Sequence, residues 1–173
     1  MNGKVIKETM ESENITYEIR NYEECVEVFK AFNNGEIEIF EDEQKLEKYA
    51  KKVIKNGHLI VDRKEGRPVG VVSFYCNDTV SKTAYVTMLI LSNRLGFAKG
   101  HTFFRLCAKA IELVNKTSME RIRIEVKENN TKARILYEHM GFKYTEEKGN
   151  DSLYMEISLE DYRKNFKKRT VGE

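Results

Sequence analysis

The sequence is poor in features that define several protein classes. It has no tryptophan, a single proline and three cysteines in 173 residues. The cysteines are odd in number, unclustered and set in apolar patterns, so they do not indicate a disulfide or zinc framework. We expect them to be buried free thiols in a reducing compartment, the cytoplasm. No repeat, low-complexity stretch or linker is recognisable, which predicts a single domain over residues 1–173.

The net charge is small, and long apolar runs are scarce. A net charge of +2 is too small to argue for binding to nucleic acid or to an anionic membrane. No apolar run approaches the length of a membrane span, and the polar residues 1–14 lack the apolar core of a signal peptide. The sequence therefore predicts a globular protein without a nucleic-acid or membrane partner.

What is present is a regular alternation of apolar patterns. We expect strands at 15–20, 58–62, 69–76, 83–91, 121–126, 142–147 and 152–158, and helices at 22–32, 43–55, 98–114 and 131–140. Short turns separate the three central strands, which favours an antiparallel meander. The helix that follows them implies a parallel crossover.

These patterns predict an α+β fold. Its sheet is mixed and mostly antiparallel, with about six to seven strands, and helices cover both faces. The adjacent parallel strands are expected to splay and admit an elongated ligand. Residues 160–173 are expected to form a C-terminal helix or tail, and the basic run 163–169 is interpreted as a solvated tail.

Residues 93–104 join a strand to a helix, with two glycines and an alanine at the junction. Small residues let a ligand approach the main chain, and the N–H groups that open a helix attract anions. A P-loop pattern is absent, and a Rossmann fingerprint would need glycine at Ala98 and His101. The pyrophosphate-loop pattern Gln/Arg-x-x-Gly-x-Gly/Ala fits Asn93-x-x-Gly96-x-Ala98 except at its first residue. An ordinary strand-to-helix turn is the alternative.

A second segment starts at Asn130 and reads Asn-x-x-Ala-x-x-Leu-Tyr-x-x-x-Gly-Phe, ending at Phe142. With the glycine segment before it, this sequence resembles the signature of the GNAT superfamily of acyl-CoA-dependent N-acyltransferases, over residues 15–159. The resemblance implies a GNAT-like fold and transfer of an acetyl group from acetyl-CoA to a primary amine. It implies direct attack in a ternary complex, with no metal and no covalent acyl-enzyme. A homodimer is also expected from the family.

The resemblance further implies where acetyl-CoA binds. Main-chain amides of residues 94–100 would hold its pyrophosphate, and the strand at 88–90 would pair with its pantetheine arm. Asn130 would contact the pantetheine, and it also suits the N-cap of its helix. The implied donor-binding residues are Met88, Leu89, Ile90, Asn93, Arg94, Leu95, Gly96, Phe97, Ala98, Lys99, Gly100, Asn130 and Ala133. Asn93 departs from the usual Gln or Arg, which puts the role of its side chain in question.

Tyr137 is the implied catalytic residue, because in the family its hydroxyl protonates the leaving thiolate; a plain core position is the alternative. A backbone N–H near Leu89 would stabilise the oxyanion. No carboxylate lies on the strand before the glycine segment, so the general base is left unassigned. Glu125 is a candidate, and a surface ion pair with Arg121 or Arg123 is its alternative. None of the three histidines is expected to be catalytic.

Glu36 and Glu38 belong to an acidic and apolar loop, residues 35–43, where similar proteins place acceptor-binding residues. With Glu125 they are the candidate substrate-binding residues, and their charge would suit a cationic amine. An acidic cap for the next helix is the alternative. The acceptor is expected to be a small-molecule amine, or else a protein amine. A second hypothesis is a non-catalytic module that binds acyl-CoA as a sensor or scaffold.

Overall fold

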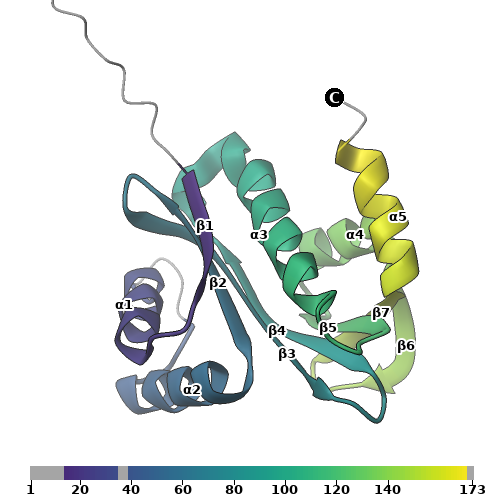
Figure 1. Cartoon of the computed structure of the whole chain (residues 1–173), viewed down its shortest axis with the longest axis horizontal. Coiled ribbons are helices and arrows are strands. Elements are labelled where there is room, and N and C mark those ends of the chain that lie inside the picture. Colours follow the sequence, from purple (N-terminus) through teal and green to yellow (C-terminus); the bar gives the residue numbers. More distant parts are fainter. Residues whose placement is uncertain (1–13, 35–38, 171–173) are drawn as a thin grey trace, which may run out of the picture.

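The structure, a computed structural model, describes residues 14–34 and 39–170. Figure 1 shows its elements, and each expected strand and helix is present at nearly the expected bounds. In chain order they are β1 (Asn14–Ile19), α1 (Tyr22–Phe32), α2 (Glu43–Asn56), β2 (His58–Lys64), β3 (Arg67–Asp78), β4 (Thr83–Leu91), η1 (Asn93–Ala98), α3 (Lys99–Val114), β5 (Arg121–Lys127), α4 (Thr131–Met140), β6 (Lys143–Lys148), β7 (Ser152–Ser158) and α5 (Leu159–Thr170).

The described strands form one seven-stranded sheet in the order β1-β2-β3-β4-β5-β7-β6. All neighbours are antiparallel except β4 and β5, which are parallel. The long crossover through η1 and α3 makes this pair parallel, as the order of the elements predicts. The mixed, mostly antiparallel sheet expected from the sequence is confirmed.

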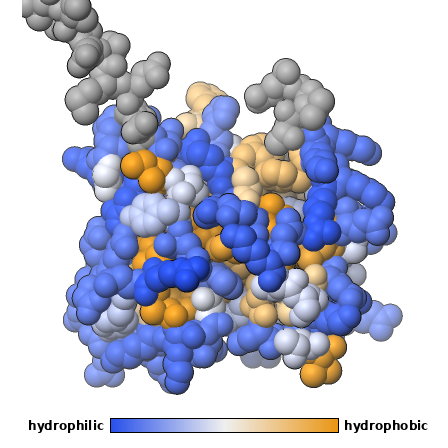
Figure 2. Space-filling view, viewed as in Figure 1, coloured by the Kyte–Doolittle hydropathy of each residue, from blue (hydrophilic) through white to orange (hydrophobic). Residues whose placement is uncertain are grey.

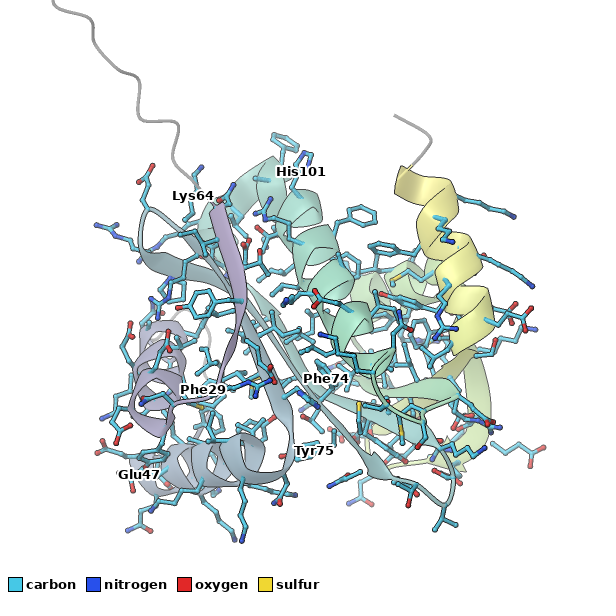
Figure 3. All side chains as sticks on the ribbon, in the orientation of Figure 1. Phe29, Glu47, Lys64, Phe74, Tyr75 and His101 are labelled. Atoms are coloured by element: carbon cyan, nitrogen blue, oxygen red, sulfur yellow. The ribbon has the colours of Figure 1, made fainter. Side chains whose placement is uncertain are left out.

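Helices cover both faces of the sheet (Figure 1). Leu59 and Val61 of β2 pack with α1 and α2, whereas Ile60 between them belongs to the core beneath α3. Alternate residues of a strand point to opposite faces, so a strand buried on both sides is apolar throughout. Figure 3 shows the two cores through Phe29 of α1, on one side, and Phe74 of β3, which belongs to the other.

Of the two expected forms, a helix or a tail, the C-terminal segment takes the helix α5; its basic side chains at 163, 164, 167 and 168 are exposed, as expected, but its other side packs on the domain. Tyr162 is buried, and its ring stacks on Phe166 at a centroid distance of 5.8 Å. Asn165 Nδ2 donates a hydrogen bond to the main-chain oxygen of Met140 (3.0 Å), at the end of α4. Hydrophobic residues show between α3 and α5 in Figure 2. The ring centroids of Phe104 on α3 and Phe166 on α5 are 5.9 Å apart. The helix α5 therefore packs on the domain through its apolar side, although it carries many basic residues.

Candidate active site

The parallel strands β4 and β5 stay paired over only part of their length. Their register ends with Val86 opposite Ile124, although β4 continues to Leu91 and β5 to Lys127. The predicted splay is therefore present. Residues 88–90 are half-buried on a stretch of β4 that has no partner on the β5 side. Such an edge can pair with an extended ligand through main-chain hydrogen bonds.

A β-bulge lies where the strands separate. The register of β4 on β3 shifts beside Ser73, so that Thr87 has no residue opposite it. Thr87 Oγ1 lies 2.8 Å from the Tyr49 hydroxyl of α2 and 3.0 Å from Ser73 Oγ, and those two oxygens are 2.6 Å apart. The three hydroxyls hold the bulge to α2. Sequence reasoning missed this cluster, because alternation along β4 does not reveal an inserted residue.

β4 ends in a glycine-containing turn. The short 3₁₀ helix Asn93–Ala98 takes the place of the first residue of the expected long helix, and Ser92 Oγ accepts the N–H of Arg94 (3.2 Å). Gly96 has φ +52° and ψ −124°, a conformation that strains any residue with a Cβ. A Cβ built on Gly96 or Gly100 would meet no atom within 4 Å. Space over this main chain is therefore open to a ligand.

The N-terminus of α3 has no side-chain cap. Side chains cap α1, α2 and α4, whereas Ala98 provides no such bond to α3, whose first turn holds no acidic residue. Its first amides and the helix dipole therefore favour an anion. Lys99 Nζ donates to Asn93 Oδ1 (3.1 Å), so the Asn93 side chain holds a cation beside these amides.

The residues expected at the pyrophosphate are accessible in different degrees. Asn93, Arg94, Gly96, Phe97 and Gly100 are exposed, and Leu95, Ala98 and Lys99 are half-buried. Phosphate oxygens need both main-chain donors and access from solvent, and this segment offers the two together.

α4 follows β5 and begins at a capped end. Asn130 is exposed, and its side chain accepts the N–H of the half-buried Ala133 (3.2 Å), as predicted for an N-cap. Gly141 ends the helix with φ +97°, in the left-handed conformation typical of a glycine cap. The motif residues thus fix both ends of the helix that carries Tyr137.

Tyr137 lies half-buried on α4, facing α3 and the sheet. Its ring is 5.8 Å from that of Phe142, and it lines an apolar cavity of about 70 Å³ that Val86 and Ile124 also line. Burial, with a smaller effect of Cys107, raises the pKa of Tyr137 to about 12. Among the described residues none forms a hydrogen bond with its hydroxyl. The hydroxyl therefore carries its proton at neutral pH and is available as a donor.

Glu125 is the first residue of β5 beyond the last pair with β4, and its side chain is exposed. Its carboxylate accepts a hydrogen bond from the Ser152 hydroxyl. The expected ion pair with Arg121 or Arg123 is wrong, because Arg123 Nη1 lies 2.7 Å from Glu147 and its Nε 2.5 Å from Glu156. Within the described part of the chain Glu125 has no cationic partner.

The thiols are unsuited to nucleophilic catalysis. Cys25, Cys76 and Cys107 are free and buried or half-buried. Burial raises the pKa of Cys25 to about 12 and the pKa values of Cys76 and Cys107 to about 11. A thiol attacks as its thiolate, so these groups are inert near neutral pH.

The remaining expectations concern the loop before α2 and the histidines. Glu36 and Glu38 lie outside the described residues. Asp42 caps α2 by accepting the N–H of Lys45 (2.7 Å), so the capping interpretation holds for this acid. His58 Nδ1 lies 2.7 Å from a Glu18 carboxylate oxygen, which is a structural contact between strands.

Neither a metal site nor a membrane-spanning helix is found in the described residues. Over residues 14–34 and 39–170, no three His, Cys, Asp or Glu side chains are grouped so as to hold a metal ion. In the same part of the chain, no helix combines the length and the apolar character that crossing a membrane requires.

The splayed pair, the uncapped α3 and the motif on α4 all lie within residues 19–142. A model of the acetyltransferase (GNAT) family matches residues 19–142, and the chain belongs to this family. It is accordingly an acyltransferase. Among curated proteins none matches the sequence.

Solved structures of low sequence identity share the fold. A GNAT-family acetyltransferase from Streptococcus pneumoniae is 18% identical with a TM-score of 0.64, over 85% of this chain and 99% of that one. Ard1 from Thermoplasma volcanium is 15% identical with a TM-score of 0.66, over 84% and 97%. The IAA acetyltransferase from Bacillus cereus is 16% identical with a TM-score of 0.60, over 85% and 100%. At these identities the likeness describes the fold alone.

Proposed function

We propose that this protein transfers the acetyl group of acetyl-CoA to a primary amine, in a ternary complex and without a covalent acyl-enzyme. The acceptor is a small molecule or, alternatively, a protein amine, and the reaction takes place in the cytoplasm. The observation that carries the proposal is the protonated hydroxyl of Tyr137 beside the open edge of β4. An acid at this place is what the departure of a thiolate requires.

The donor site fits the elongated shape and the charge of CoA. The amides at the start of α3 and the main chain of Gly96 and Gly100 would bind the pyrophosphate, with Lys99 beside them. The free edge of β4 at residues 88–90 would hold the pantetheine arm as an added strand. Asn130 and Ala133, at the start of α4, would contact the pantetheine arm.

The reaction then follows from the groups around the opening. The amine nitrogen bonds to the thioester carbonyl carbon, and the carbon–sulfur bond breaks. The oxyanion formed between these events would accept a hydrogen bond from an amide of β4 near Leu89. The Tyr137 hydroxyl would give its proton to the thiolate of CoA. An acceptor that arrives as an ammonium ion loses two protons overall: one before attack, and one from the tetrahedral adduct, which restores the proton of Tyr137.

Glu125 is our proposed acceptor of the amine proton. It stands at the mouth of the splay, on the strand face opposite to the cavity lined by Ile124, and it has no cationic partner in the described part of the chain. The ammonium group of a bound acceptor would be a cationic partner for Glu125. The carboxylate would bind the protonated amine, and it would take the proton directly or through water before attack. Glu36 and Glu38 would add negative charge for a cationic acceptor.

The direct test is release of CoA from acetyl-CoA, followed with a thiol reagent across a panel of amines: diamines, amino sugars, amino acids and a lysine peptide. We expect turnover with at least one cationic amine and the loss of most of it in Tyr137→Phe. Binding of acetyl-CoA measured by calorimetry completes the test. Tight binding without turnover on any amine would instead support a sensor or scaffold module.

A further inference from the structure

The cavity beside Tyr137 is not explained by the transfer of an acetyl group alone. It has a volume of about 70 Å³ and lies between the sheet and α3, α4 and α5. Three of the residues around it are small, namely Ala84 of β4 and Cys107 and Ala110 of α3. Protein interiors are otherwise packed to the density of organic crystals, so small residues at three neighbouring positions leave a space that larger side chains would have filled.

The lining determines what can occupy this space. Aliphatic and aromatic side chains provide nearly all of it, and the polar side-chain atoms of the lining residues are the hydroxyls of Tyr137 and Tyr162 and the Cys107 thiol. The Cys107 thiol and the Tyr162 hydroxyl interact with one another. Water needs two to four polar partners to stay in a cavity, whereas apolar cavities remain dry and bind hydrocarbon. The suitable occupant is an apolar group.

The position of the cavity indicates which apolar group this is. Val86 and Ile124, which line it, form the last pair before β4 and β5 separate. The thioester would lie at this point, because the pantetheine arm would follow the free edge of β4 and Tyr137 would donate its proton to the thioester sulfur. Ala84 and Ile122, one alternation deeper along the same strands, also line the cavity. A chain that extends the acetyl methyl would therefore enter it.

We propose that the cavity receives the hydrocarbon tail of the acyl group, so that the preferred donor is a short-chain acyl-CoA such as butyryl-CoA. The proposal rests on the function proposed above and specifies its donor. A water molecule occupies about 30 Å³ in the liquid. A volume of about 70 Å³ thus has room for at least two methylene groups beyond the acetyl group. The bonds made and broken in the transfer are unchanged.

Titration calorimetry of the full chain tests this without knowledge of the acceptor. The ligands are CoA and its acetyl, propionyl, butyryl and octanoyl thioesters. We expect the Kd to fall roughly fourfold per methylene from acetyl- to butyryl-CoA, the factor that corresponds to about 0.8 kcal/mol for a buried CH₂. Octanoyl-CoA should gain nothing more, because its tail exceeds the cavity.

A filled cavity provides the matched comparison. Ala110→Leu places a larger side chain in the cavity from α3, and Ala108→Leu makes the same change on the exposed side of that helix. We expect Ala110→Leu to abolish the gain from propionyl and butyryl groups and Ala108→Leu to keep it. Thermal unfolding verifies that both variants are folded. Ala84→Val, from the sheet side, replaces Ala110→Leu if that variant is unfolded.

The possible results separate the two proposals. Equal affinity for all thioesters would overturn the acyl-tail inference alone. So would an equal loss of CoA and butyryl-CoA binding in Ala110→Leu, which would mean that the cavity holds the pantetheine arm. Failure of every CoA species to bind would overturn the proposed function itself.

Discussion

Arg105 of α3 forms a bidentate ion pair with Asp62 of β2, whose side chain is fully buried. Arg105 Nη2 lies 2.6 Å from Asp62 Oδ2, and Nε lies 3.2 Å from both carboxylate oxygens. Thr16 Oγ1 donates to the same carboxylate (2.8 Å), and Arg105 also donates to Thr102 Oγ1 (3.0 Å). The network ties the N-terminal half of α3, whose first amides belong to the proposed pyrophosphate site, to β1 and β2.

Removing the charge of Asp62 tests this anchor. Asp62→Asn leaves a partly buried guanidinium without its counter-charge, and we expect the free energy of unfolding to fall by about 3 kcal/mol. This loss is small for a broken buried ion pair, because the Arg105 side chain is 33% exposed and water screens its charge. Urea denaturation measures the change. The exposed pair Lys30–Glu43 is the control, and Glu43→Gln should cause no measurable loss; equal losses in both variants would contradict the buried anchor.

Tyr137→Phe tests the acid. The substitution keeps the ring and its contact with Phe142 but removes the proton donor, so we expect kcat to fall about 10²–10⁴-fold with little change in thermal stability. Because the pKa of Tyr137 is raised to about 12, the wild-type rate should not decline from loss of this acid below about pH 11. A rate that declines between pH 8 and 10, or full activity in the variant, would remove Tyr137 from the mechanism.

A feature can be predicted from the sequence when it depends on residues that are close together along the chain. Periodicity predicts the seven strands and the helices α1 to α4, because each buries one face or two against neighbours that are themselves regular, whereas it leaves α5 open between a helix and a tail. The partner of Arg123 was predicted wrongly, because it depends on the register of two strands distant in the sequence. Glu156 of β7 stands directly opposite Arg123 and forms the ion pair that was the alternative role for Glu125.

In the candidate site, too, local features were predicted and features that depend on tertiary packing were not. Asn130 and Gly141 have their expected roles, because capping depends on a few consecutive residues. The bulge at Thr87, the cavity and the buried Asp62 depend on packing between distant elements. Asp62 ends an apolar run in the sequence, and only the tertiary fold brings Arg105 of α3 onto it.

The pH dependence of stability follows from the buried thiols. Burial raises the folded-state pKa of Cys25 from 9.0 to about 12 and those of Cys76 and Cys107 from 9.0 to about 11. Above pH 9 the unfolded chain loses these protons while the folded chain keeps them, so stability falls as the pH rises towards 11–12. By pH 10 each buried thiol should lower the free energy of unfolding by about 1 kcal/mol. Urea denaturation from pH 8 to 10.5 measures the slope, and Cys25→Ala should flatten it; identical slopes would contradict the buried thiol.

Gly100→Ala separates stability from ligand binding. Gly100 is in the first turn of α3, where alanine is a better helix former by about 1 kcal/mol and a Cβ meets no protein atom within 4 Å. We expect the variant to be more stable than the wild type and yet to bind CoA about tenfold less tightly, since the Cβ occupies space meant for the pyrophosphate. Thermal melting and calorimetry provide the two values. Unchanged affinity would place the pyrophosphate elsewhere.

Glu125→Gln tests the proposed proton acceptor through the pH dependence of the reaction. Glutamine can still accept the hydrogen bond of Ser152, so the local structure should persist while the charge and the basicity are lost. We expect kcat/KM for the amine to fall about 10²-fold or more at pH 7, and the deficit to shrink as the pH rises, because the neutral amine then needs no base. Glu128→Gln changes an exposed carboxylate just beyond β5 and should leave the profile unaltered. A deficit in Glu125→Gln that is the same at every pH would mean that the carboxylate positions the acceptor and does not take its proton.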